Sequence, residues 1–295
     1  MKQPFIVALI PAYNEERTIA KIVLKTKKYV DKVIVCDDGS TDMTGEIARA
    51  LGAEVIRHER NMGKGVALRT GLEYAKKLDP DIVVVLDADG QHNPDEIPKL
   101  IEPLLRGETD IVIGSRFLTP NEIPLYRRIG NRILTSLVNL KAGSRLTDTQ
   151  SGFRAFNRRA LEEIKVTEKG MSVESQMIID AIKKGLRASE IPITVSYKEA
   201  RHKRSPLLHF MEIVSLILRR TVEEKPILYL GLPGFMLILA GLIAGLRVLD
   251  IFMRTRAIAI GTALITAILT ISGLLLIVIA ILMHYIKVYL KERYA

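Results

Sequence analysis

Cysteine and tryptophan are nearly missing from this chain: 295 residues contain one cysteine, Cys36, and no tryptophan. One cysteine cannot build a disulfide framework, which is consistent with a domain that folds in the cytosol. The first ten residues lack the charged and apolar regions of a signal peptide. No turn carries Gly-x-Gly-x-x-Gly, which disfavours a classical dinucleotide fold, and the stretch Asn61 to Gly65 is not the Gly-x-x-x-x-Gly-Lys loop, followed by Ser or Thr, of a P-loop.

Charge is scarce in two long runs near the C-terminus. Ile227 to Leu249 has Arg247 as its only charge, and Ala257 to Ile286 has none. Each run is long and apolar enough to predict a transmembrane helix, at about 227–249 and 258–286. The short segment Asp250 to Arg256 would join them as a hairpin.

Basic residues flank both outer ends of this hairpin. By the positive-inside rule, these flanks predict a two-span protein of the cell membrane with its N-terminal domain and both termini in the cytoplasm. The predicted domains are a cytosolic domain at 1–205, a juxtamembrane amphipathic helix at 206–224, and the hairpin with a short basic tail at 225–295.

A net charge of +10 is compatible with nucleic acid, an anionic membrane or anionic substrates as partners. No expected helix has a basic stripe with interleaved aromatic residues, so nucleic acid is not expected. The basic cluster at 201–204 instead precedes an apolar stripe at 207–218, a pattern typical of a helix in the membrane interface.

The N-terminal part alternates short apolar strands with helices five times. The expected strands are 5–10, 32–36, 54–57, 82–86 and 110–114. Continuous β-branched runs of this kind predict an α/β fold with a doubly wound, mostly parallel sheet. Polar turns follow the strands and would gather at one edge of that sheet, where such folds bind ligands.

The turn after the fourth strand, Asp87 to His92, is the most informative of these. Asp87, Asp89 and Gln91 place oxygen donors at alternate positions of a short loop, a set suited to Mg²⁺ or Mn²⁺. An ordinary turn with two aspartates is the alternative. The glycine-containing stretch Asn61 to Gly65 adds Lys64, which could meet a phosphate.

Six segments together resemble the family-2 glycosyltransferases of the GT-A fold, in particular the polyprenyl- and dolichyl-phosphate sugar transferases such as dolichyl-phosphate mannose or glucose synthases. They are Pro11-Ala12-Tyr13-Asn14-Glu15, Asp37 to Asp42, Asn61 to Gly65, Asp87 to His92, Gly114-Ser115-Arg116, and Asp148 to Arg154. They cover most of residues 4 to 205.

The resemblance implies roles for individual residues. The nucleotide-sugar site would consist of Pro11, Tyr13, Glu15, Cys36, Asp38, Lys64, Asp87, Ala88 and Asp89. Asp87, Asp89 and Gln91 would hold the metal, and the catalytic residues would be Asp89, Arg116 and Asp148. Arg116 would contact the donor diphosphate or the acceptor phosphate.

Relatives often carry an Arg-x-x-Gly-x-Ser-Lys pattern before the membrane, and this chain lacks its Gly and Lys. The acceptor phosphate would therefore be bound by Arg116 with some of Arg201, Lys203 and Arg204. The helix expected at 126–140 suits either a membrane surface or core packing. Glu174 suits either a buried salt bridge or catalysis.

A phosphate acceptor is already ionised at neutral pH and needs cations, whereas a hydroxyl acceptor needs a general base. A basic cluster without an evident base favours a polyprenyl phosphate as acceptor and a UDP- or GDP-linked sugar as donor, with inversion by one direct displacement, for glycan or glycoprotein assembly. One alternative is a processive polysaccharide synthase, whose Gln-x-x-Arg-Trp motif is missing. Another is an inactive membrane assembly factor. Whether the chain forms a homo-oligomer stays open.

Overall fold

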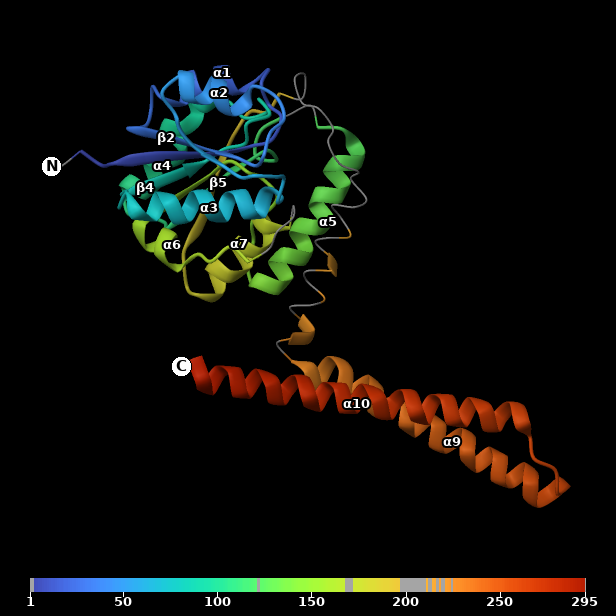
Figure 1. The fold of residues 1–295 in the computed structure, drawn as a ribbon. Coiled ribbons are helices and arrows are strands. Elements are labelled where there is room, and N and C mark those ends of the chain that lie inside the picture. The colour runs from blue at the N-terminus through green and yellow to red at the C-terminus, as the bar shows by residue number, and fades with distance from the viewer. Residues whose placement is uncertain are drawn as a thin grey trace. The chain divides into compact units, whose positions relative to one another are not determined.

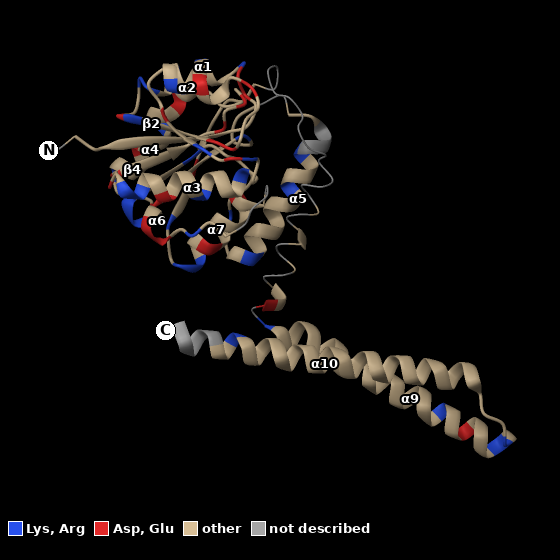
Figure 2. Ribbon diagram, viewed as in Figure 1, with Lys and Arg blue, Asp and Glu red and all other residues tan. Residues whose placement is uncertain are grey.

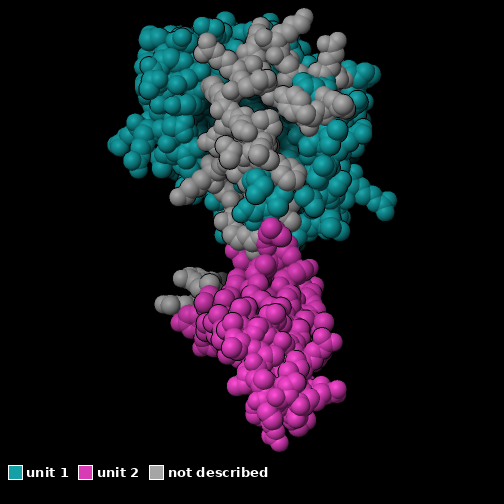
Figure 3. Space-filling model, turned by 90° about the vertical axis from the view of Figure 1, so that its right-hand side faces the viewer, with its two compact units in different colours: residues 1–216 teal, residues 217–295 magenta. Residues whose placement is uncertain are grey.

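The computed structural model describes residues 3–120, 123–167, 172–196 and 225–294, together with a few positions between 211 and 223. The chain forms two compact units, Met1–Leu216 and Ile217–Ala295 (Figure 3). The predicted basic residues Arg201, Lys203 and Arg204 lie outside the described residues, as does most of the expected interfacial helix.

The first unit is built on a seven-stranded sheet of order β3-β2-β1-β4-β6-β5-β7 (Figure 1). Its strands are β1 (Ile6–Ala12), β2 (Lys32–Asp37), β3 (Glu54–Arg57), β4 (Ile82–Val85), β5 (Ile111–Ser115), β6 (Arg154–Asn157) and β7 (Ala188–Pro192). All neighbours pair in parallel except β6, which runs antiparallel to both β4 and β5. The predicted doubly wound, mostly parallel sheet is confirmed, and the reversed strand is an addition to it.

Helices connect these strands and cover the sheet. They are α1 (Ile19–Thr26), α2 (Thr44–Ala50), α3 (Lys64–Lys77), η1 (Pro94–Glu96) leading into α4 (Ile97–Leu105), α5 (Leu125–Ala142), α6 (Arg158–Glu163) and α7 (Val173–Lys183). The expected start of the fourth connection is present: the Asn93 side chain accepts a hydrogen bond from the Asp95 amide, and Pro94 follows it.

Alternate residues of each strand point to opposite faces of the sheet, and helices cover both faces. Ile10 packs in one cluster with Ile22 of α1 and Leu100 of α4. Leu9 points to the other side, under α3. There a Cβ on Gly71 would lie 2.2 Å from Leu9 Cδ1, so only glycine lets α3 approach β1 this closely. Two covered faces explain why the strands are continuously apolar.

The second unit is a helical hairpin of η2 (Ile227–Gly231), α9 (Leu232–Thr255) and α10 (Ile260–Tyr294). Two segments, Ile227–Thr255 and Ile260–Tyr289, are long and apolar enough to be candidate membrane spans. Helix α9 continues to Thr255, through most of the loop expected at 250–256. In this last turn Arg254 Nε donates to Asp250 Oδ1 at 2.8 Å and Thr255 Oγ1 donates to the Ile251 carbonyl. The connection is residues 256–259, and the charges of α9 gather beside it (Figure 2).

Glycines bring the backbones of α9 and α10 into direct contact. A Cβ on Gly273 would lie 2.5 Å from the Gly234 carbonyl oxygen, and one on Gly234 would lie 2.7 Å from the Gly273 oxygen. Gly241 is similarly close to Thr270, whose Oγ1 would be 2.5 Å away. Small residues at a helix crossing are the usual means of close packing between membrane helices.

Candidate active site

Loops at the carboxyl edge of the sheet are tied to one another by hydrogen bonds. After β1, Asn14 adopts φ 53° and its side chain accepts from the Thr41 amide at 2.8 Å. The Glu15 amide donates to Thr44 Oγ1 at 2.8 Å. Thr18 Oγ1 donates to the Ala88 carbonyl at 2.6 Å, which joins the loop after β1 to the loop after β4. The loops in which sequence analysis placed the nucleotide-sugar site are thus connected along one edge of the sheet, where the carboxyl ends of parallel strands meet.

Asp38 fixes the loop that precedes α3. Its carboxylate accepts hydrogen bonds from the amides of Met62 and Gly63, at 3.0 and 2.8 Å, and it pairs with His58 Nδ1 at 2.7 Å. Cys36 is fully buried beside His58, and burial raises the pKa of its thiol to about 12, with help from nearby Asp38. The first residue of α3, Lys64, is therefore held at the sheet edge.

Lys64 lies between two carboxylates. Its Nζ is 2.7 Å from Asp87 Oδ1 and 2.6 Å from Glu174 Oε1. Burial by itself would lower the pKa of Lys64, but the charges of Asp87 and Glu174 outweigh burial and raise it. Burial would likewise raise the pKa of Asp87, and Lys64 and His92 outweigh it, so that pKa is lowered. Asp87 and Lys64 are both charged at neutral pH.

The next carboxylate along the loop, Asp89, accepts from the Gln91 amide at 3.0 Å and from Gln91 Nε2 at 2.5 Å. Within the described part of the chain, no three His, Cys, Asp or Glu side chains converge to hold a metal. The donor set still fits Mg²⁺ or Mn²⁺, because these ions commonly bind one or two carboxylates together with substrate phosphates. Asp87, Asp89 and Gln91 are the residues that would hold the ion.

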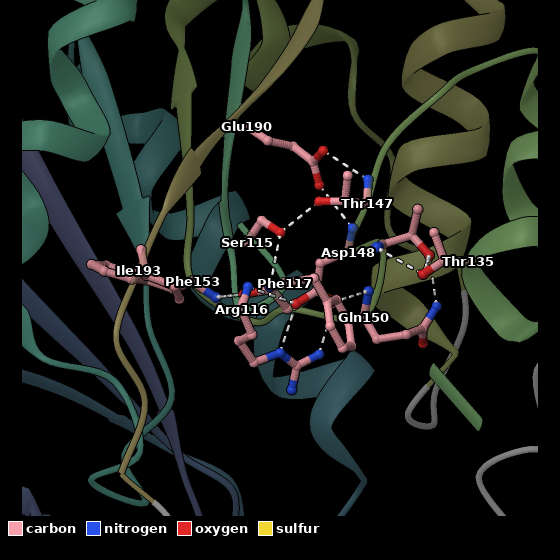
Figure 4. A network of polar contacts seen from close by, with 12 residues as sticks. Ser115, Arg116, Phe117, Thr135, Thr147, Asp148, Gln150, Phe153, Glu190 and Ile193 are labelled. Atoms are coloured by element: carbon pink, nitrogen blue, oxygen red, sulfur yellow. Dashed lines mark hydrogen bonds and ion pairs between the residues drawn. The ribbon is translucent and has the colours of Figure 1, made fainter. Parts of the chain in front are cut away.

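Arg116, just past β5, is held by Asp148 (Figure 4). Its Nε donates to Asp148 Oδ2 at 2.7 Å and its Nη2 to Oδ1 at 2.8 Å, and its backbone amide also donates to Oδ2. Burial would raise the pKa of Asp148, but Arg116 outweighs it and lowers that pKa. Behind this pair, Glu190 of β7 accepts from the Thr147 and Asp148 amides at 2.7 and 2.8 Å. The guanidinium is therefore fixed from two elements.

The reversed strand β6 brings a further segment to the same edge. Because β6 is antiparallel to its neighbours, the chain enters it where they end, and Arg154 pairs with both Val85 and Ile113. The fully buried Arg154 side chain donates to the carbonyls of Thr149, Ser151 and Glu174 and thereby holds the entering segment. A Cβ on Gly152 would lie 2.4 Å from Asp87 Oδ2, so this segment passes directly over Asp87.

The structure thus pairs Lys64 with Asp87 and Arg116 with Asp148 at the same edge of the sheet. The charge of Arg116 also lowers the pKa of Asp87. Pro11, Tyr13 and Glu15 lie at and after the end of β1 on that edge. Glu174 forms a salt bridge, one of its two sequence interpretations. Sequence reasoning gave no role to His58 or Glu190. Each lies far along the chain from the aspartate or loop it supports, so no local pattern marks it.

A family model described as glycosyl transferase family 2 matches residues 7–165, which include these loops. The chain belongs to this family. It is therefore an enzyme fold of the GT-A type, as the resemblance predicted. The family model ends before α7, so Glu174 and Glu190 lie beyond the matched residues.

Two relatives are named as dolichyl-phosphate sugar transferases, and a similar solved structure is a glucosyltransferase. A UDP-N-acetylglucosamine–dolichyl-phosphate N-acetylglucosaminyltransferase of Methanococcus voltae is 38% identical over 68% of this chain and 88% of its own length. A dolichyl-phosphate hexose transferase of Haloferax volcanii is 31% identical over 75% and 95%. Glucosyl-3-phosphoglycerate synthase of Mycobacterium tuberculosis, solved with Mn²⁺, UDP-glucose and phosphoglyceric acid, has a TM-score of 0.61 and 27% identity over 74% and 79%.

Proposed function

We propose that this enzyme is a membrane-anchored, metal-dependent, inverting hexosyltransferase that moves a sugar from a UDP- or GDP-linked donor to a polyprenyl or dolichyl phosphate. One observation carries the choice of acceptor. Two buried carboxylates of the site, Asp148 and Glu174, are each bound to a cation, Arg116 and Lys64. A carboxylate held in this way is a poor general base, whereas a phosphate acceptor needs none.

The chain's own residues support such a displacement. The bound metal would neutralise charge on the leaving diphosphate. Lys64 and Arg116 add fixed positive charge beside Asp87, and Asp148 orients the Arg116 guanidinium. An ionised phosphate oxygen attacks the anomeric carbon while the bond to the diphosphate breaks, so one direct step inverts that carbon. Arg116 and the predicted cluster at 201–204 would bind the acceptor phosphate.

The second unit offers features that suit a lipid acceptor. A groove of about 730 Å³ lies between the start of the first candidate span and the end of the second, and its walls include Leu228, Phe235 and Ile281. Lys225, His284 and Lys287 also line it. An apolar groove with cations beside it complements a lipid tail with a phosphate head. This supports a membrane-anchored enzyme that acts on a lipid.

The test is transfer itself. The purified full-length chain in detergent is incubated with radiolabelled UDP- and GDP-sugars, Mn²⁺ and either polyprenyl phosphate or unphosphorylated polyprenol, and the lipid product is extracted. We expect product with the phosphate alone. Transfer to polyprenol, or none to either lipid from any donor, would contradict the proposal.

A further inference from the structure

Lys64 contacts two carboxylates, Asp87 and Glu174, and binding of a nucleotide sugar by Lys64 and Asp87 does not by itself require Glu174. Glu174 is 5% exposed and lies in the first turn of α7, and the proposed transfer gives it no task. Its Oε1 nevertheless holds Lys64 Nζ at 2.6 Å. Because α3 begins at Lys64, the ammonium is anchored by two helices, and Glu174 is what keeps its side chain directed at the loop after β4.

Both oxygens of Asp87 lie close to other groups of the protein, and Oδ1 is paired with a cation at hydrogen-bond distance. Lys64 binds Oδ1 at 2.7 Å, and Oδ2 faces the Gly152 backbone with His92 Nε2 at 3.8 Å. Asp89, the other expected metal ligand, is bound to Gln91. The carboxylate most central to the metal site therefore already binds a cation that belongs to the protein.

A free divalent ion and the complex of that ion with a diphosphate should differ in how strongly the nearby cations repel them. An ion binding Asp87 by itself would stand close to the Lys64 ammonium, with Arg116 and Arg154 adding positive charge nearby. Like charges at such short distances repel strongly where water is largely excluded. A diphosphate supplies anionic oxygens for the ion and for Lys64 at the same time, so the repulsion is offset.

We propose that Lys64, anchored by Glu174, keeps Asp87 from binding a divalent cation alone, so that the cation binds together with a nucleoside diphosphate. Lys64 and Glu174 are then positioning residues that impose the order of binding. The inference rests on the proposed function in one respect, namely that the diphosphate belongs to a sugar donor.

Metal binding without turnover tests this. We would measure the affinity of the full-length chain for Mn²⁺ by electron paramagnetic resonance, with Mn²⁺ alone and with UDP or GDP added. For the wild type we expect weak binding of Mn²⁺ alone and much tighter binding with the nucleotide. Lys64→Gln should bind Mn²⁺ alone at least about tenfold more tightly, and the strengthening by nucleotide should shrink correspondingly, since coupling is reciprocal.

Two variants separate competition for Asp87 from a change of net charge. Lys77→Gln removes a lysine from the far, exposed end of the same helix and should leave Mn²⁺ binding as in the wild type. Lys64→Gln/Glu174→Gln keeps the wild-type net charge and neutralises both members of the pair. This double variant should still bind Mn²⁺ alone more tightly than the wild type. It also replaces Lys64→Gln in the test if that single variant does not fold.

Equal or weaker binding of Mn²⁺ alone by folded Lys64→Gln or by the double variant would overturn the inference, as would wild-type protein that binds Mn²⁺ equally well with and without nucleotide. Failure of the proposed function has a separate signature: no sugar reaches polyprenyl phosphate, whatever the metal affinities. The two ideas can therefore fail independently.

Discussion

Asp148 binds both sides of the Arg116 guanidinium fork, and its side chain is fully buried. Removing one partner of a buried ion pair leaves the other charge uncompensated. We expect Asp148→Asn to lower the free energy of unfolding at pH 7 by about 3 kcal/mol and to slow transfer about tenfold to a hundredfold, because Arg116 loses its orientation. Urea unfolding and initial rates measure the two effects.

This effect has a defined pH dependence. The pKa of Asp148 is lowered in the folded protein, so its contribution is complete above the unfolded value of about 3.9 and is lost as pH falls through the lower folded value. The stability difference between wild type and Asp148→Asn should therefore shrink below about pH 4. As a control, Asp79→Asn removes an exposed partner of Arg158 and should cost less than about 1 kcal/mol. A difference that persists unchanged at pH 2 would contradict the assignment.

Asp89 gives the clearest test of metal dependence. Its carboxylate contacts only its own loop, through Gln91, in the hydrogen bonds described, so its loss should leave the sheet intact. We expect Asp89→Ala to abolish transfer with an unchanged unfolding midpoint, and excess chelator to abolish wild-type transfer. Asp95→Ala, at the start of the following helix, removes partly exposed contacts with Lys25 and Tyr29 and should retain activity. Full wild-type activity in chelator would refute the metal site.

At the level of elements, the hairpin depends on backbone contact at Gly234 and Gly273. A leucine at 273 would force α9 and α10 apart, and overpacking of this kind costs about 1 to 3 kcal/mol. Cysteines placed at Gly245 and Thr266, where a Cβ would lie 3.4 Å from Thr266 Cγ2, should form a disulfide readily. Gly273→Leu should slow that reaction.

Gly261→Leu is the matched control for the hairpin, since a Cβ there meets nothing within 4 Å. It adds the same volume to the same helix and should leave the cross-linking rate unchanged. Equal slowing by both substitutions would show that the rate does not report the glycine contact.

Five of the six parallel strands, β1 to β5, could be predicted to within about two residues, because strands buried on both faces are continuous apolar runs. The sixth, β7, has the sequence Ala-Ser-Glu-Ile-Pro, which is not such a run, and it was not expected. Strand β6 was not expected either. Its sequence, Arg154-Ala155-Phe156-Asn157, contains a buried arginine whose side chain donates to the carbonyls of Thr149 and Ser151, just before the strand, and of Glu174 in α7. The loop that carries Asp87 and Asp89 could be predicted from two aspartates after a strand, whereas the ion pair that fixes Arg116 depends on Asp148, 32 residues away.

For the whole molecule, the proposal predicts that the connection at 256–259 faces the side of the membrane opposite the first unit. In sealed vesicles with the native orientation, an impermeant maleimide should label Ala257→Cys and not Met43→Cys. Both sites are exposed on their own units. Native Cys36 should not interfere, because it is buried and its thiol has a pKa of about 12. Labelling of Met43→Cys from outside would refute the topology.

The strand order also bears on how the chain folds during synthesis. Strands β1 to β4 are neighbours in the sheet and emerge first, whereas β5 pairs only with β6 and β7, which follow it in the sequence. Its apolar residues have no partner strand until residues 154–157 have been made, which at about 5 to 20 residues per second leaves them unpaired for seconds. The apolar hairpin emerges later still. We therefore expect aggregation, or a need for a chaperone, to arise while the nascent chain still has an incomplete sheet.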